Sequence, residues 1–140
     1  MYLLDTNVVS DLRRFRPERQ TLFDWHRTNA DVAMAISAIT ILELEWGYLK
    51  AAAQGADHAH WIREWIDRVV EERFSQAILP VDIAVARSAA YLKRQRTFPS
   101  ADLLIGATAL ANDLVLVTRN TADFEGMGIP LLNPWDPTPT

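Results

Sequence analysis

The segment that most constrains this chain is Tyr2–Leu12, in which a short apolar run is followed by one acid and then by an amphipathic stretch. The pattern predicts a buried strand over Tyr2–Leu4 that delivers Asp5 to its carboxyl end, where a helix begins. Parallel α/β sheets bind ligands just outside the carboxyl ends of their strands. Asp5 is therefore the first candidate for a functional side chain.

Further apolar runs alternate with helical stretches along the chain. Val32–Ile36 and Leu114–Val117 are apolar throughout, which predicts strands buried on both faces, and shorter strands are expected at Ile78–Leu79 and Ile129–Leu132. The expected helices are Asn7–Arg14, Glu18–Thr28, Ala38–Ala53, Ala56–Phe74, Asp82–Arg96 and Ala101–Asn112. This alternation predicts an α/β fold whose mostly parallel sheet is covered by helices on both faces.

Two of the expected helices, Ala38–Ala53 and Ala56–Phe74, form an αα-hairpin. Leu42, Trp46 and Leu49 make an apolar stripe on the first helix, which we expect to pack into the core. The hairpin carries more tryptophan and tyrosine than one side of a small core needs. An interface for a second copy or a partner peptide is the alternative.

Length and composition indicate one cytoplasmic domain. A chain of 140 residues without linkers or repeats suits a single domain, placed at residues 1–135 with a flexible tail at 136–140. The absence of cysteine excludes disulfides and thiolate metal sites and fits a reducing cytoplasm. We find no signal peptide and no apolar run of bilayer length, so no membrane association is expected.

The charge is acidic overall but uneven. The net charge of −4 argues against a generally basic surface, yet the cationic residues are 12 arginines against 2 lysines. Two clusters lie near candidate acids and fit a polyanion-binding surface: Arg13, Arg14, Arg16 and Arg19, and Lys93, Arg94 and Arg96. Solvated helix faces and a coding bias toward arginine are the alternative explanations.

Acids in three later segments are expected to approach Asp5. Glu43 lies in the second turn of the helix after the Val32–Ile36 strand, whereas Glu45 lies about 200° round that helix and faces elsewhere. Asp102 lies in the first turn of its helix, after the expected cap Ser100, where the helix dipole is expected to keep it ionised.

Asn120 and Asp123 directly follow the strand at Leu114–Val117, which is expected beside the first strand. Taken singly, each acid also has an ordinary reading as a helix cap, a solvated helix residue or a loop residue. Several carboxylates in one crevice repel one another, and Mg²⁺ or Mn²⁺ removes that cost because both ions prefer carboxylate oxygen. Zinc is not expected, because the histidines lie on helical stretches away from these acids: His26, His58 and His60.

In four segments the chain resembles a PIN-domain ribonuclease, specifically a VapC-like toxin of a type II toxin–antitoxin pair. The matching segments are Leu3–Leu12, Ser37–Gly47, Ser100–Asp113 and Leu116–Phe124, and Asn133–Trp135 resembles the FitB-like subgroup. The resemblance covers essentially the whole chain in the family's order.

The resemblance implies a three-layer α/β/α fold with strand order 3-2-1-4-5, a Mg²⁺- or Mn²⁺-dependent endoribonuclease and a homodimer. It also implies inhibition by a VapB-like antitoxin, with DNA bound only through that antitoxin. By position, Asp5, Glu43 and Asp102 match the first three acids of the family. The fourth ligand is left open between Asn120 and Asp123.

The same resemblance suggests supporting roles for several polar side chains. Hydroxyl groups are expected to hold the acids in place, from Thr6, Ser37 and Thr118. The candidates for binding the RNA backbone are Arg13, Arg14 and Arg119. The sequence does not identify the RNA, because substrate choice depends on the surface around the site.

Two other classes of protein are considered. A phosphatase of the haloacid-dehalogenase type also has an Asp after its first strand, but it needs a second Asp where this chain has Asn7. A catalytically silent PIN-like binding module would act only with its antitoxin, and the presence of Asp5, Glu43 and Asp102 argues against it.

Overall fold

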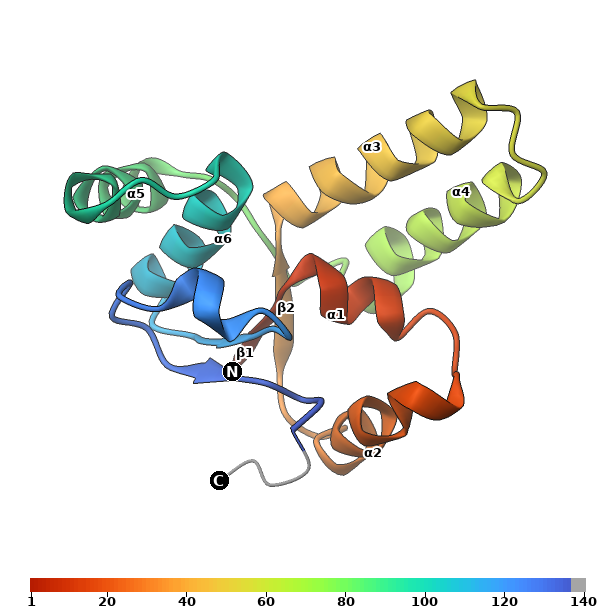
Figure 1. The fold of residues 1–140 in the computed structure, drawn as a ribbon, viewed down its shortest axis with the longest axis horizontal. Coiled ribbons are helices and arrows are strands. Elements are labelled where there is room, and N and C mark those ends of the chain that lie inside the picture. Colours follow the sequence, from red (N-terminus) through yellow and green to blue (C-terminus); the bar gives the residue numbers. More distant parts are fainter. Residues whose placement is uncertain (137–140) are drawn as a thin grey trace.

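The computed structural model describes residues 1–136, which form a five-stranded parallel sheet in the order β3-β2-β1-β4-β5 (Figure 1). The strands are β1 (Tyr2–Leu4), β2 (Met34–Ser37), β3 (Ile78–Leu79), β4 (Val115–Val117) and β5 (Leu131–Leu132). β1 lies in the middle of the sheet and pairs in parallel with β2 and β4. In this register, Leu3 lies opposite Ala35 on β2 and Leu116 on β4. The predicted sheet and its strand order are confirmed.

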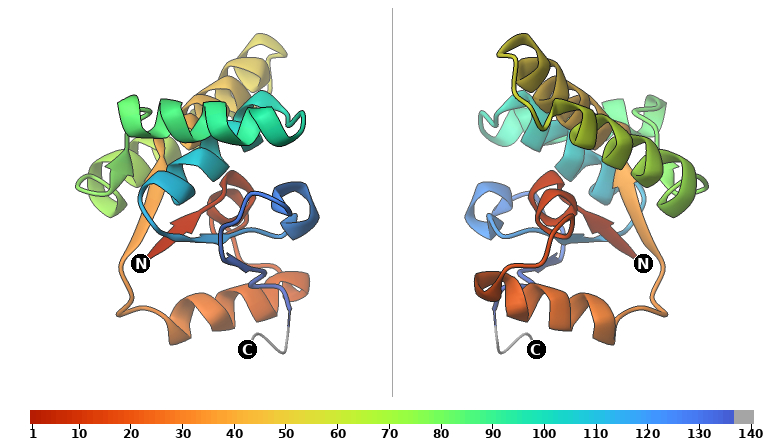
Figure 2. Two further views of the ribbon diagram at one scale, coloured as in Figure 1. Left: turned by 90° about the vertical axis from the view of Figure 1, so that its left-hand side faces the viewer. Right: turned by 90° about the vertical axis from the view of Figure 1, so that its right-hand side faces the viewer.

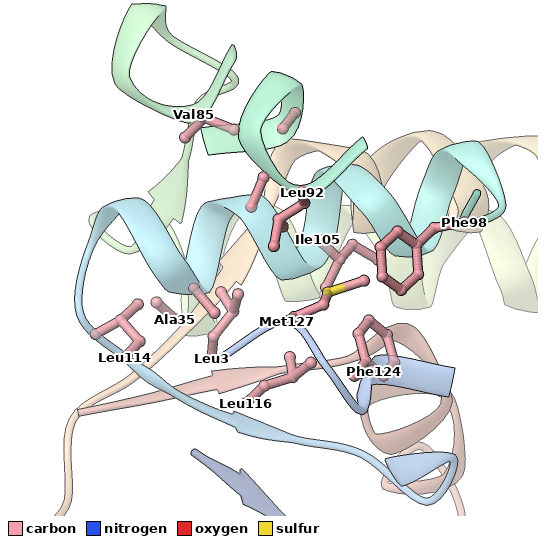
Figure 3. Close-up of a cluster of buried hydrophobic side chains, with 13 residues drawn as sticks. Leu3, Ala35, Val85, Leu92, Phe98, Ile105, Leu114, Leu116, Phe124 and Met127 are labelled. Carbon is pink, nitrogen blue, oxygen red and sulfur yellow. The ribbon is translucent and has the colours of Figure 1, made fainter. Parts of the chain in front are cut away.

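Alternation of side chains along the short strands divides the core in two. Leu3 and Leu116 point into one cluster with the inner faces of α5 (Ile83–Gln95) and α6 (Ser100–Ala111) (Figure 3). The neighbouring residues Leu4 and Val117 point into the other cluster. Helices therefore cover both faces of the sheet, as the apolar strand segments predict. Figure 2 shows the strands with α5 and α6 above them and α2 (Gln20–Thr28) below.

The second cluster is covered by four helices, α1 (Thr6–Asp11), α2 (Gln20–Thr28), α3 (Ala38–Ala53) and α4 (Ala59–Arg68). Short helical turns complete the chain, at Pro17–Arg19, Val69–Arg73 and Thr121–Phe124. Helix boundaries differ by a few residues from the expectation because caps decide them. Asp82 caps α5 as expected, whereas α6 begins at Ser100 itself, with Pro99 as the capping position.

The expectation that Leu42, Trp46 and Leu49 pack into the core is wrong. These side chains are 60%, 57% and 54% exposed, respectively. The inner face of α3 is instead formed by Leu44, which is buried, and by its neighbours one turn away. The physical reason is the orientation of the helix: Thr40 and Leu44 are buried, and Leu42 and Trp46 lie about 200° round the helix from Leu44, so the stripe faces away from the core. α3 packs beside α4 (Figure 1).

The end of the chain packs against the core. Asn133–Trp135 continue from β5, and Trp135 packs against the second core cluster. Of the predicted tail at 136–140, residues 137–140 lie outside the described residues. Within residues 1–136, no helix has the length and apolar character needed to cross a membrane.

Candidate active site

Asp5 lies at the centre of the sheet's carboxyl edge, because it directly follows the middle strand β1. Its backbone N–H donates to the Val117 carbonyl of β4 at 2.9 Å, and its side chain caps α1 by accepting the Thr6 N–H at 2.8 Å. The residue is only 6% exposed. A nearly buried carboxylate is therefore fixed at the point where parallel sheets bind ligands.

The second carboxylate oxygen of Asp5 is held by two side chains from different segments. Thr118, which directly follows β4 and is fully buried, donates its hydroxyl to Asp5 Oδ2 at 2.8 Å. Asn7 donates its amide to the same oxygen at 3.3 Å, and its Oδ1 accepts the Arg119 N–H at 3.3 Å. Asn7 thus links α1 to the segment after β4.

Glu43 reaches the same region from α3. The Thr6 hydroxyl donates to Glu43 Oε1 at 2.6 Å and lies 3.0 Å from the Thr40 hydroxyl. Since Thr6 has one hydroxyl proton and gives it to Glu43, Thr40 must donate to Thr6. Glu45 lies elsewhere, in a bidentate pair with Arg63 of α4 at 2.6 and 2.7 Å.

Asp102 and Asp123 complete an acidic cluster with Asp5 and Glu43. Burial, followed by the charges of Asp5, Asp123 and Glu43, raises the pKa of Asp102 to about 6. Burial also raises the pKa of Asp5, with smaller effects from Glu43 and Asp123, against the lowering effect of its hydrogen bonds. The four carboxyl groups are close enough to repel one another.

The raised pKa of Asp102 qualifies the expectation that the dipole of α6 keeps its carboxyl ionised. Burial, and then the charges of Asp5, Asp123 and Glu43, act against the dipole. With a pKa of about 6, the carboxyl is still mainly ionised at neutral pH.

Hydrogen bonds place two further predicted residues, Asn120 and Ser37. Asn120 directly precedes the turn that carries Asp123, and its N–H donates to the Thr118 hydroxyl at 3.0 Å. Ser37 is buried, and its hydroxyl caps α3 by accepting the Ile39 N–H at 3.0 Å. The hydrogen bonds of Ser37 thus place it at the start of α3.

The three predicted arginines are arranged differently from one another. The guanidinium of Arg119 lies 3.5 Å from Asp11 and stacks over Trp135 at 4.7 Å, so it has partners within the protein. Arg13 and Arg14 follow the other end of α1, and Arg13 lies over the ring of Trp65 at 5.4 Å.

Sequence reasoning missed Asn7 and Thr40. In the sequence, Asn7 only distinguishes this chain from a phosphatase. Its position two residues after Asp5 is the feature that could have predicted its role, because an amide there can reach back to the preceding carboxylate across the first helical turn. Thr40 lies one turn before Glu43 on the same helix face, which is the corresponding signal for it.

The donor chemistry of the cluster fits a hard divalent cation. A cation would offset the burial and the weaker repulsion that raise the pKa values of Asp5 and Asp102. Within residues 1–136, no three acidic or histidine side chains are already arranged as ligands of one ion. Carboxylate oxygens are nevertheless the ligands that Mg²⁺ and Mn²⁺ prefer.

Comparisons with known proteins agree with this architecture. The family model of the PIN domain matches residues 2–129, so the chain belongs to the PIN domain family. It is 33% identical to the VapC ribonuclease Y4jK of Sinorhizobium fredii over 98% of this chain and 99% of that protein. It is 30% identical to the toxin FitB of Neisseria gonorrhoeae, over 96% and 99%.

A solved structure extends the likeness to three dimensions. The structure of FitAB bound to an IR36 DNA fragment contains a chain that superposes with a TM-score of 0.77 at 27% identity. The match covers 97% of this chain and 96% of that one. The fold and the family are thus established together.

The raised pKa of Asp102 gives a prediction for the metal-free protein. Between the unfolded value of 3.8 and the folded value of about 6, the folded chain binds more protons at this carboxyl than the unfolded chain does. The contribution of Asp102 to the free energy of unfolding therefore falls as the pH rises through this window, and stays low above it.

We expect the Asp102→Asn variant to show a flatter dependence of unfolding temperature on pH than the wild type, in EDTA, from pH about 4 to about 7. The difference between the two proteins isolates this group, because Asp5 acts in the same direction in both. Parallel curves for wild type and variant would contradict the prediction.

Proposed function

We propose that this protein is a metal-dependent endoribonuclease and the toxin of a type II toxin–antitoxin module. The observation that carries the proposal is the convergence of Asp5, Glu43, Asp102 and Asp123 at the carboxyl edge of the central strands. Carboxylates gathered in this way destabilise a fold unless a bound cation neutralises their charge.

Asp5 and Asp102 would bind Mg²⁺ or Mn²⁺ directly. When bound, the ion supplies an acidified water molecule and neutralises charge on the phosphoryl oxygens in the transition state. Thr118 and Asn7 fix the orientation of the Asp5 carboxylate through the hydrogen bonds described above. Glu43 is oriented by Thr6 and would bind the ion through water or align the attacking water.

Asp123 and Asn120 would provide the remaining ligand. Asp123 is exposed, and its charge acts on both Asp5 and Asp102. Asn120 is exposed as well, and its backbone is anchored to Thr118. Either side chain, or a water held by both, would serve.

The names of relatives support the biological role. One relative is named a ribonuclease and another a toxin, and a structural neighbour is a FitAB complex bound to DNA. By analogy, we infer a VapB-like antitoxin partner, with DNA bound through that partner. We infer a cytoplasmic role, because RNA is the proposed substrate and a chain without cysteine suits reducing conditions.

Expression of the chain without an antitoxin tests this role in cells. We expect growth arrest with loss of intact RNA, and neither effect for the Asp5→Asn variant produced at the same level. Arrest that is equally strong with the variant would contradict a ribonuclease toxin and would favour inhibition by binding alone.

We also infer a homodimer, because the stripe of Leu42, Trp46 and Leu49 on α3 is exposed. Large contiguous apolar surface on a small soluble protein marks an interaction site. We expect the Trp46→Glu variant to be monomeric in light scattering at concentrations at which the wild type is a dimer. The matched control is Phe15→Glu, an exposed aromatic outside the stripe. A Trp46→Glu variant with the wild-type mass would contradict this interface.

A further inference from the structure

A basic and aromatic groove lies between α4 and the segment that joins α1 to α2. Its volume is about 600 Å³. One side is formed by four arginines after α1, and α4 contributes a fifth, so the cationic lining consists of Arg13, Arg14, Arg16, Arg19 and Arg68. Trp61, Ile62 and Trp65 of α4 form its apolar part. Arg68 and the two tryptophans are far from the arginine cluster in the sequence, and the fold brings them beside it.

The positive charge of this groove is largely uncompensated. Arg19 is paired with Asp11 at 3.1 Å, and it also donates to the Arg14 carbonyl at 3.0 Å. These contacts hold the turn that carries the other arginines. Within residues 1–136, the other four arginines of the groove make no ion pair, and no acidic residue is among those that line it. A groove of this kind on a chain of net charge −4 selects a polyanion.

The aromatic side chains indicate which polyanion fits. Trp61 is 64% exposed, so much of its surface is free to contact a ligand. Trp65 lies beneath the guanidinium of Arg13 at 5.4 Å. Grooves that bind single-stranded nucleic acid combine cationic side chains along the backbone with aromatic rings on which bases stack, and this groove has both components.

The groove also lies at a suitable place relative to the acidic cluster. Asp5 caps the start of α1 and the arginines follow its end, so the two sites are separated by the length of one short helix, roughly 10 Å. Figure 1 shows α1 running from the strand ends toward the turn before α2, with α4 alongside. A strand of a few nucleotides can span both sites.

We propose that this groove binds the single-stranded RNA substrate on one side of the cleaved bond, with Trp61 as a stacking surface and Arg14 and Arg68 contacting phosphates. The proposal rests on the proposed ribonuclease function for the identity of the ligand. It adds a defined path for the strand and assigns to α4 a role in substrate binding.

The test measures binding of a short fluorescein-labelled single-stranded RNA by fluorescence anisotropy in EDTA, so that no cleavage contributes. The variants are Arg14→Glu/Arg68→Glu and Trp61→Ala, and the control is Arg87→Glu, an exposed arginine on α5 outside the groove. We expect the double variant to bind at least about tenfold more weakly and to lower the salt slope by about 1.4, because each lost phosphate contact on a single strand accounts for about 0.7.

We expect Trp61→Ala to weaken binding about tenfold while leaving the salt slope unchanged, since a stacked ring carries no charge. An affinity equal to that of the Arg87→Glu control in both variants would overturn the proposal. Unchanged RNA binding together with lost binding of a short labelled peptide rich in Glu and Leu would also overturn it, and would assign the groove to a protein segment.

The outcome is separable from that of the proposed function. If the wild type fails to cleave RNA but the groove variants lose RNA binding, the groove proposal stands and the nuclease proposal fails. If the wild type cleaves RNA and the groove variants bind as the control does, the reverse holds.

Discussion

Replacing Asp5 by Asn is expected to lower the rate of RNA cleavage about 1,000-fold or more while the protein stays folded. Asp5 is the most buried of the four acids and would be a direct ligand of the ion. Metal-based stabilisation of phosphoryl charge contributes several kcal/mol to a hydrolytic transition state, and each factor of ten in rate corresponds to about 1.4 kcal/mol. An amide binds Mg²⁺ more weakly than a carboxylate does, so most of that contribution is lost.

The Asp5→Asn variant should stay folded, because the effects of the substitution on stability oppose each other. Asn is as good a helix cap as Asp, and the substitution removes a carboxylate whose pKa is raised by burial. Against this, the new amide nitrogen cannot accept the hydrogen bonds that Thr118 and Asn7 donate to Asp5 Oδ2. The matched control is Asp82→Asn, because Asp82 also caps a helix through its carboxylate but lies outside the acidic cluster. The control should cleave at the wild-type rate, and cleavage by Asp5→Asn at that rate would remove Asp5 from the reaction.

Asp102→Asn is the second substitution for which we expect a loss of about 1,000-fold, since Asp102 is the other proposed direct ligand. Its carboxyl is repelled by three acids, so the variant should also unfold at a higher temperature than the wild type in EDTA at neutral pH. Loss of activity with gain of stability separates a functional role from a structural one.

The control for Asp102 lies at the other end of the same helix. Asp113 follows α6, is exposed and has a positive φ of 55°, a conformation that Asn tolerates well. Asp113→Asn should therefore leave both cleavage and stability near wild-type values. An Asp102→Asn variant that retains most of the activity would contradict its assignment as a ligand. We expect a smaller loss for Asp123→Asn, because Asn120 offers a second oxygen donor beside it.

The sheet could be predicted because adjacent residues in the short strands are both apolar. Leu3 and Leu4 are both apolar, which requires cover on both faces, and only helices on both sides supply it. The acids are predictable because Asp5 and Asp123 follow strands and Glu43 and Asp102 lie in the first two turns of helices. Parallel strands bring such positions to one edge of the sheet.

The features that could not be predicted depend on distances between segments. The stripe of Leu42, Trp46 and Leu49 has the period of a core helix, but periodicity does not reveal that α3 turns the face of Thr40 and Leu44 toward the core instead. The pKa of Asp102 depends on its burial and on three charges from other elements, which act against the local dipole. The role of Arg68 in the groove likewise appears only when α4 is placed beside the turn after α1.

The most direct test is RNA cleavage by the purified chain, free of antitoxin, in Mg²⁺, in Mn²⁺ and in EDTA, beside the Asp5→Asn variant. We predict cleavage by the wild type with either ion, none in EDTA, and none by the variant under any condition. Cleavage that persists in EDTA, or that is equal in the variant, would contradict a metal-dependent centre built on Asp5.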